Sequence, residues 1–193
     1  PCSMVTVGER DDGRRGELEL TARHLQHPTF LSVGARSVKP RSLGVSHVLD
    51  NGVPIQLMRG RLAASSDHID IWKFGWGTAY IDVELGPKLR LLADHGVRGC
   101  PGGTLLEIAW LQGRSVEFFD WAQAVGFPCV EVSNGATDMP PNHKRDLIEA
   151  ARDRGFEVLS EVGSKRPETP VARQWVSEIQ ADFAAGAHWV VTE

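Results

Sequence analysis

Short apolar runs rich in β-branched residues alternate along most of this chain with stretches of helical length that carry one apolar face. The apolar runs are residues 44–49, 69–74, 97–101, 129–133, 157–162 and 188–192. The amphipathic stretches are residues 55–64, 85–95, 115–125, 141–154 and 170–185. Such a repeat is typical of an α/β protein in which helices connect parallel strands. We therefore expect about six βα units.

Two α/β architectures fit this repeat, a (β/α)8 TIM barrel and a doubly wound sheet. Charged residues recur at the ends of the apolar runs, at Asp50, Lys73, Glu131, Glu161 and Glu193, one βα unit apart in the later part of the chain. No G-x-G-x-x-G sequence follows the first run to indicate a dinucleotide site, so we predict the barrel. A complete barrel has eight units and typically about 250 residues. We expect this chain to be a truncated piece of one.

Composition narrows the class of protein. The 193 residues are 41% hydrophobic and 24% charged, with a formal net charge of −4, which is typical of a folded domain. The acidic balance argues against a broad nucleic-acid-binding surface, and no apolar run has the roughly 18 residues of a membrane span. We expect a cytoplasmic protein that binds neither nucleic acid nor membrane. Residues 1–28 are expected to form a flexible extension before a partial barrel domain, 29–193.

The cysteines and histidines do not indicate a metal site. Cys2, Cys100 and Cys129 lack the CxxC spacing of zinc ligands, and we predict that Cys100 and Cys129 are small core residues. The seven histidines show neither HxH nor HExxH spacing. We expect all of them to be structural or on the surface.

Lys73 is the first candidate for binding an anion. It lies in the apolar run 69–74, on the same face as Ile69 and Ile71 if that run is a strand. A buried ammonium group is costly unless an anion or a carboxylate meets it. The alternative is a lysine at the end of a strand whose amine reaches solvent.

Two glycines follow the third apolar run, in the sequence Gly102-Gly103-Thr104. Adjacent glycines after a strand can present backbone N–H groups to a phosphate or another oxyanion, which makes these three residues candidates for substrate binding. A tight turn explains the same sequence equally well.

Glu131 and Glu161 are candidate metal ligands. Each lies in a β-branched run, where an ionised carboxylate needs a cation. Two such groups on neighbouring strands could chelate a divalent ion, and Mg²⁺ is the natural choice for an all-oxygen site. Lys165, close to the second carboxylate, could serve as a proton donor. The alternative is structural pairing of the glutamates with lysines across the strands.

Taken together, the segments at the strand ends resemble the phosphosulfolactate synthase family. The similarity covers about residues 30–193. It is carried by Lys73-Phe74-Gly75-Trp76-Gly77-Thr78, by Pro101-Gly102-Gly103-Thr104 with Glu107, by Glu131-Val132-Ser133-Asn134-Gly135, and by Ser160-Glu161-Val162-Gly163-Ser164-Lys165. The order and spacing of these segments make the set specific.

The resemblance implies a (β/α)8 barrel and an enzyme, a carbon–sulfur lyase. Its activity would be the Mg²⁺-dependent addition of sulfite to phosphoenolpyruvate, giving (2R)-3-phosphosulfolactate, which opens coenzyme M biosynthesis in methanogens. By the same resemblance Lys165 is the general acid, Glu131 and Glu161 are ligands of the metal or its water, and Lys73 binds an anion. The expected partners are small anionic substrates, with a homo-oligomer as a further possibility.

Three positions depart from the archaeal form of the family and resemble its bacterial branch: Asn51, Asn134 and Ser164. The family continues past the sixth strand with two more, so this piece is expected to be inactive by itself. Two alternatives stay open. One is a non-catalytic barrel that acts as a stress or interaction protein, and the other is an aldolase-type lyase with Lys73 or Lys165 as a Schiff-base lysine.

Overall fold

The computed structural model of this protein describes residues 30–32, 34, 37–163 and 172–192. The chain from Ser37 onward forms one compact unit, which contains all of the strands and helices described below. The extension expected over residues 1–28 lies outside the described residues.

All of the strand pairs in the described residues are parallel. The strands are β1 (His47–Asp50), β2 (Ile71–Phe74), β3 (Arg98–Pro101), β4 (Cys129–Val132), β5 (Glu157–Val162) and β6 (Trp189–Thr192). They pair in the orders β1-β2-β3 and β4-β5-β6, and β3 lies next to β4. Strand order therefore follows chain order, without the reversal that defines a doubly wound sheet. The α/β fold of a partial barrel is as predicted.

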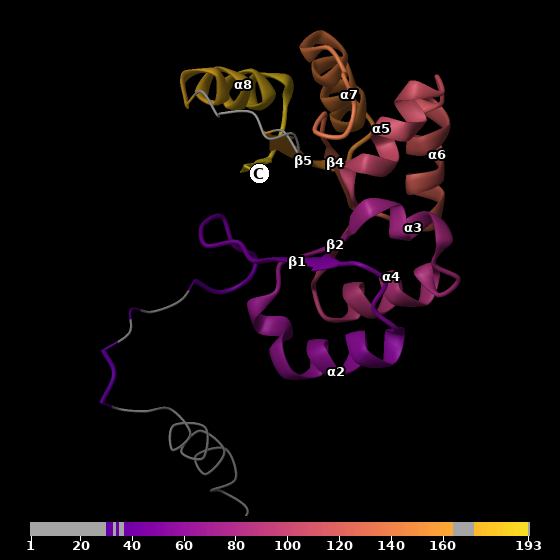
Figure 1. The fold of residues 1–193 in the computed structure, drawn as a ribbon. Coiled ribbons are helices and arrows are strands. Elements are labelled where there is room, and N and C mark those ends of the chain that lie inside the picture. The colour runs from indigo at the N-terminus through magenta and orange to yellow at the C-terminus, as the bar shows by residue number, and fades with distance from the viewer. Residues whose placement is uncertain (1–29, 33, 35–36, 164–171, 193) are drawn as a thin grey trace, which may run out of the picture. The chain divides into compact units, whose positions relative to one another are not determined.

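Helices cover the outer side of these strands, as Figure 1 shows. They are α2 (Ile55–Ser65), α3 (Thr78–Ile81), α4 (Leu85–Asp94), α5 (Gly103–Leu111), α6 (Ser115–Val125), α7 (Pro141–Asp153) and α8 (Ala172–Ala185), with 3-10 turns η1 (Ser66–His68) and η2 (Gly75–Gly77). The five predicted helices are present, and their described ends agree with the prediction to within one residue. The start predicted at residue 170 lies outside the described part. None of the helices that the structure describes is long and apolar enough to cross a membrane.

The alternation of side chains along each strand separates two cores. On β2, Trp72 and Phe74 belong to the large apolar core that the helices cover. Ile71 belongs to a second, smaller cluster, with Cys100, Cys129 and Leu159 from the next three strands. Both cysteines are fully buried, which confirms that they are core residues. Since Ile71 and Lys73 lie on the same face of β2, Lys73 also points to the inner side of the strands.

Two ion pairs connect the amino-terminal ends of the strands. Arg41 Nη1 lies 2.9 Å from Asp70 Oδ1, and both side chains are almost fully buried. Arg98, at the start of β3, reaches Glu157 at the start of β5 with an N–O distance of 2.5 Å. The Trp189 indole N–H donates to the same Glu157 oxygen at 2.6 Å. The second pair thus ties β3 to β5 and β6, and joins the two groups of strands.

Candidate active site

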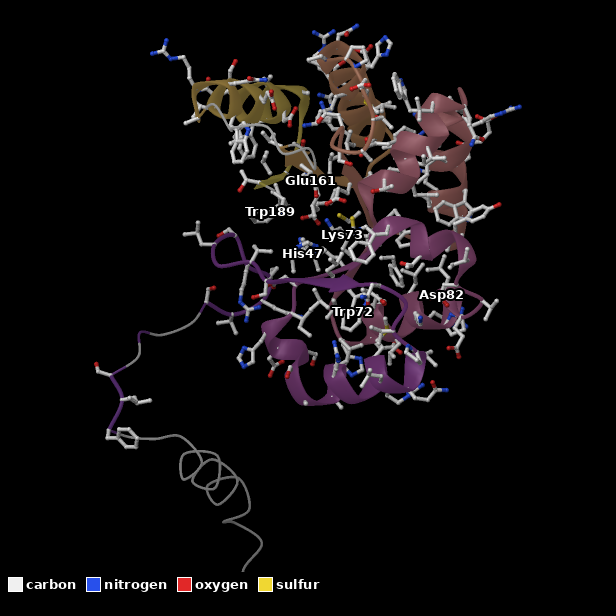
Figure 2. The ribbon with its side chains drawn as sticks, in the orientation of Figure 1. His47, Trp72, Lys73, Asp82, Glu161 and Trp189 are labelled. Carbon is white, nitrogen blue, oxygen red and sulfur yellow. The ribbon has the colours of Figure 1, made fainter. Side chains whose placement is uncertain are left out.

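Lys73 lies near the carboxyl end of β2, and the residue is only 8% exposed. Its Nζ is 2.7 Å from Glu131 Oε1 on β4 and 3.4 Å from Glu161 Oε2 on β5. Figure 2 shows Lys73 and Glu161 directed toward each other from their separate strands. The three charged side chains predicted from the sequence therefore meet at one place.

The two carboxylates keep Lys73 protonated. Burial alone lowers the pKa of Lys73, but the charges and hydrogen bonds of Glu131 and then Glu161 outweigh burial and raise this pKa above its ordinary value of 10.5. The ammonium group is therefore charged throughout the neutral range. Counted formally, one lysine and two glutamates sum to one negative charge.

Glu131 is held from a second side by the start of α5. The Gly103 N–H donates to Glu131 Oε2 at 2.7 Å, while Lys73 occupies the other oxygen. The first N–H groups of a helix have no partner within the helix and carry partial positive charge. An ionised carboxylate is thus well placed at this helix end.

The glycines at the start of α5 permit close approach of backbone to backbone. The Gly102 N–H donates to the Phe74 carbonyl at 2.8 Å, and a Cβ at Gly102 would lie 2.8 Å from that same oxygen. The N–H groups of both glycines therefore donate to acceptors within the protein. Binding of a ligand by Gly102, Gly103 and Thr104 remains a prediction.

A small pocket of about 50 Å³ opens at the carboxyl ends of the strands. Its walls are Leu49, Lys73, Gly75, Trp76, Gly102, Gly103, Thr104, Glu131 and Glu161. These include every site residue predicted from the sequence except Lys165, which lies outside the described residues. Carboxyl ends of strands are where active sites of (β/α)8 barrels lie.

Trp76 forms one wall of the pocket in a strained conformation. Its φ and ψ angles are 51° and 31°, in the left-handed region that side chains other than glycine seldom adopt. It lies between Gly75 and Gly77, and its side chain remains 67% exposed. An exposed aromatic ring in a costly conformation at the rim of a pocket is a sign of a binding role.

Binding of Mg²⁺ by Glu131 and Glu161 remains a prediction, with which the chemistry of the donor set is compatible. Two carboxylates from neighbouring strands converge on the pocket, and Mg²⁺ commonly takes one or two carboxylates and completes its shell with substrate and water oxygens. In the part of the chain that the structure describes, no three His, Cys, Asp or Glu side chains come together as a ready-made metal site. Glu131 and Glu161 would hold the ion, and substrate or water would supply the rest.

Two residues beside this site were given no role from the sequence, although Glu107 belongs to the segments that resemble the family. Glu107 on α5 is fully buried and contacts the loop after β4. His47 on β1 is on the same face as Ile71, and burial, followed by the charge of Lys73, lowers its pKa. Figure 2 shows His47 beside Lys73. Side chains alternate along a strand, so the inward direction of Leu49 predicts that His47 also points inward. The spacing of residues in the sequence does not predict the contacts of Glu107.

The fold and this site define a barrel-type α/β protein with a lysine and two glutamates at the carboxyl ends of its strands. Residues 34–193 match the family of (2R)-phospho-3-sulfolactate synthase (ComA), and the chain belongs to that family. The resemblance found in the sequence is thereby confirmed.

Three relatives carry the name phosphosulfolactate synthase. The protein of Methanothermobacter thermautotrophicus is 41% identical over 165 residues, which are 82% of this chain and 63% of the relative. That of Bacillus subtilis is 38% identical over 84% of this chain and 66% of its own length. That of Methanocaldococcus jannaschii is 37% identical, over 78% and 62%. This chain thus spans a little less than two thirds of these relatives.

Solved structures that resemble this chain bear on the fold alone. The carboxyl transferase domain of Rhizobium etli pyruvate carboxylase matches with a TM-score of 0.53 at 14% identity. The match covers 77% of this chain and 27% of that one. An identity this low carries no information about the reaction.

Proposed function

We propose that this chain provides part of the active site of a phosphosulfolactate synthase, a lyase that adds sulfite to phosphoenolpyruvate to give (2R)-phospho-3-sulfolactate. The observation that carries the proposal is the buried lysine held between Glu131 and Glu161 in one pocket. Family membership supports the same reaction.

The reaction makes two demands on a site. The sulfur lone pair of sulfite forms a bond to C3 of phosphoenolpyruvate, the C2–C3 π bond breaks, and its electrons move through C2 into the carboxylate. A proton must then reach C2 on one face, while the phosphate ester stays intact. The site must stabilise the charge that develops on the carboxylate, and it must deliver that proton.

Charge balance favours a divalent cation. Lys73, Glu131 and Glu161 sum to one negative charge, which would repel phosphoenolpyruvate and sulfite. A Mg²⁺ ion bound there would reverse the sign of the site and act as a Lewis acid toward the substrate carboxylate. Within the chain, Lys73 fixes the two glutamates in place and offers its remaining N–H to a substrate oxygen.

Lys165 is proposed as the general acid that protonates C2. It follows Glu161 closely in the sequence, although it lies outside the described residues. The ammonium group of a lysine can serve as a general acid when it lies within reach of the carbon that takes the proton. Lys73 itself is a poor candidate for a Schiff-base lysine, because its raised pKa leaves little free amine to attack a carbonyl group.

The test uses the full-length protein, because this chain spans less than two thirds of its relatives. It follows the loss of phosphoenolpyruvate with and without sulfite and with and without Mg²⁺. We expect loss only when both are present. Lys165→Ala should lower kcat far more than it changes KM for phosphoenolpyruvate, because a proton donor acts only in the transition state. The surface variant Arg145→Ala, in an exposed ion pair, serves as the control. Loss of phosphoenolpyruvate that does not depend on sulfite would reject the proposal.

A further inference from the structure

Glu107 is a buried carboxylate that pairs with no lysine or arginine in the described part of the chain. It lies on α5, and its side chain is completely inaccessible to solvent. Burying an ionised carboxylate without a cation is costly unless hydrogen bonds replace the lost water. Its partners therefore explain why it is tolerated.

All of these partners come from the loop that follows β4. Ser133 Oγ donates to Oε1 at 2.5 Å. The Ala136 N–H, the Thr137 N–H and the Thr137 hydroxyl donate to Oε2 at 2.9, 2.8 and 2.8 Å. Four donors come close to satisfying a carboxylate. Glu107 thus fixes the loop on the helix whose first residue contacts Glu131.

Ser133 connects this network to the site. A Cβ at Gly103 would overlap the Ser133 hydroxyl and would lie 2.8 Å from Ser133 Cβ and 3.1 Å from its backbone nitrogen. Ser133 and Gly103 are therefore packed as closely as two residues can be. The Gly103 N–H in turn holds Glu131, and Glu131 holds Lys73. An unbroken series of contacts leads from Glu107 to the lysine.

We propose that Glu107 is a positioning residue for the active site, which acts through Ser133 and Gly103 on the orientation of Glu131. The inference rests on the proposed function for its kinetic consequences, whereas its structural part does not. Groups that orient a metal ligand from behind typically contribute a factor of about 10 to 100 in activity or metal affinity. Glu107 would act in a similar way through two intermediate residues, and it touches no substrate.

Two variants separate positioning from simple anchoring of the loop. Ser133→Ala and Thr137→Val each remove one hydroxyl donor to Glu107, but only Ser133 touches Gly103. We expect Ser133→Ala and Glu107→Gln to lower kcat about tenfold or more with little change in KM. Thr137→Val should lower thermal stability to a similar extent and keep kcat within about twofold. Glu117→Gln, on an exposed surface pair, is the unchanged control.

A second readout does not need the synthase reaction. The Gly103 amide proton, which donates to a carboxylate at 2.7 Å, should resonate far downfield in an NMR spectrum. It should move upfield in Ser133→Ala and Glu107→Gln, and it should stay in place in Thr137→Val. If the amide moves as expected while no variant or parent consumes phosphoenolpyruvate with sulfite, the proposed function fails and the positioning role stands.

The positioning role is rejected by either of two results. One is an unshifted Gly103 amide in both Glu107→Gln and Ser133→Ala. The other is an active parent protein in which Thr137→Val lowers kcat as much as Ser133→Ala does, because the loop would then act only as a folded unit. If Glu107→Gln folds poorly, Ser133→Ala alone still decides between the two outcomes, because it removes only one hydroxyl group.

Discussion

At the scale of single residues, the site could be predicted from the sequence because burying a charged side chain is costly. Lys73, Glu131 and Glu161 each interrupt an apolar run, and each needs an opposite charge when buried. The structure brings the three together within ion-pair distance. The opposite charges predict that the lysine pairs with the glutamates. They do not predict which donor binds each oxygen of Glu131, because this depends on the packing of α5 against β4.

Replacing Lys73 by methionine should destabilise the protein by about 3 kcal/mol at neutral pH, because the methionine leaves two buried carboxylates without a cation. Denaturant unfolding at pH 7 measures this loss. The double variant Lys73→Met with Glu131→Gln should recover part of the stability, because one of the two unpaired charges is then removed. A double variant that is no more stable than Lys73→Met would contradict this account.

At the scale of elements, a buried network joins α7, β5 and α8 behind the site. Lys144 Nζ donates to Asp182 Oδ2 at 2.7 Å and to the Glu161 carbonyl at 2.8 Å. Ser160 Oγ donates to the same Asp182 oxygen at 2.5 Å. Because Lys144 binds the backbone carbonyl of Glu161, this network fixes the end of β5. The side chain of Glu161 is the second carboxylate of the site.

Lys144→Met is expected to lower the free energy of unfolding by about 3 kcal/mol, because Asp182 would remain buried without its cation. Amide exchange at the end of β5 and in α8 should speed up more than exchange in β2. The neighbouring change Arg145→Met, on an exposed pair, should alter stability by less than about 0.5 kcal/mol. Uniform exchange throughout the protein would argue against a local role for the network.

The predictability of the elements follows their hydrophobic pattern. The helices with a clear apolar stripe, such as α4 and α7, were predicted to within a residue. Helix α5 was missed, because it is apolar on nearly all sides and starts at a pair of glycines that equally indicates a turn. The N–H groups of those glycines bind Phe74 and Glu131, partners far away in the chain that no local pattern reveals.

At the scale of the whole unit, the two ends of the strands have different tasks. The pocket lies at the carboxyl ends of the strands, and the two ion pairs lie at their amino ends. None of the residues in these ion pairs lines the pocket. Barrels commonly separate stability and function in this way. At the amino end, burial raises the pKa of Asp70, but the Ser46 N–H and the Arg41 guanidinium outweigh burial and bring that pKa below its ordinary 3.8.

Asp70→Asn should therefore cost about 3 kcal/mol of stability at neutral pH, where the buried pair with Arg41 is intact. Because the folded state holds the pKa below 3.8, the contribution of Asp70 is present above that pH and is lost as the pH falls through the folded value. The stabilities of parent and variant should converge in acid. Unfolding curves from pH 7 to pH 2 test this, with the surface change Asp153→Asn as the control.

The left-handed backbone conformation of Trp76 lowers the stability of the folded protein. Glycine or asparagine would adopt that conformation at lower cost. A library randomised at this codon and selected only for heat resistance is therefore expected to enrich both residues. Under the proposed synthase function, selection for growth that depends on the product should return tryptophan. The two selected populations would then differ at the same codon for opposite reasons.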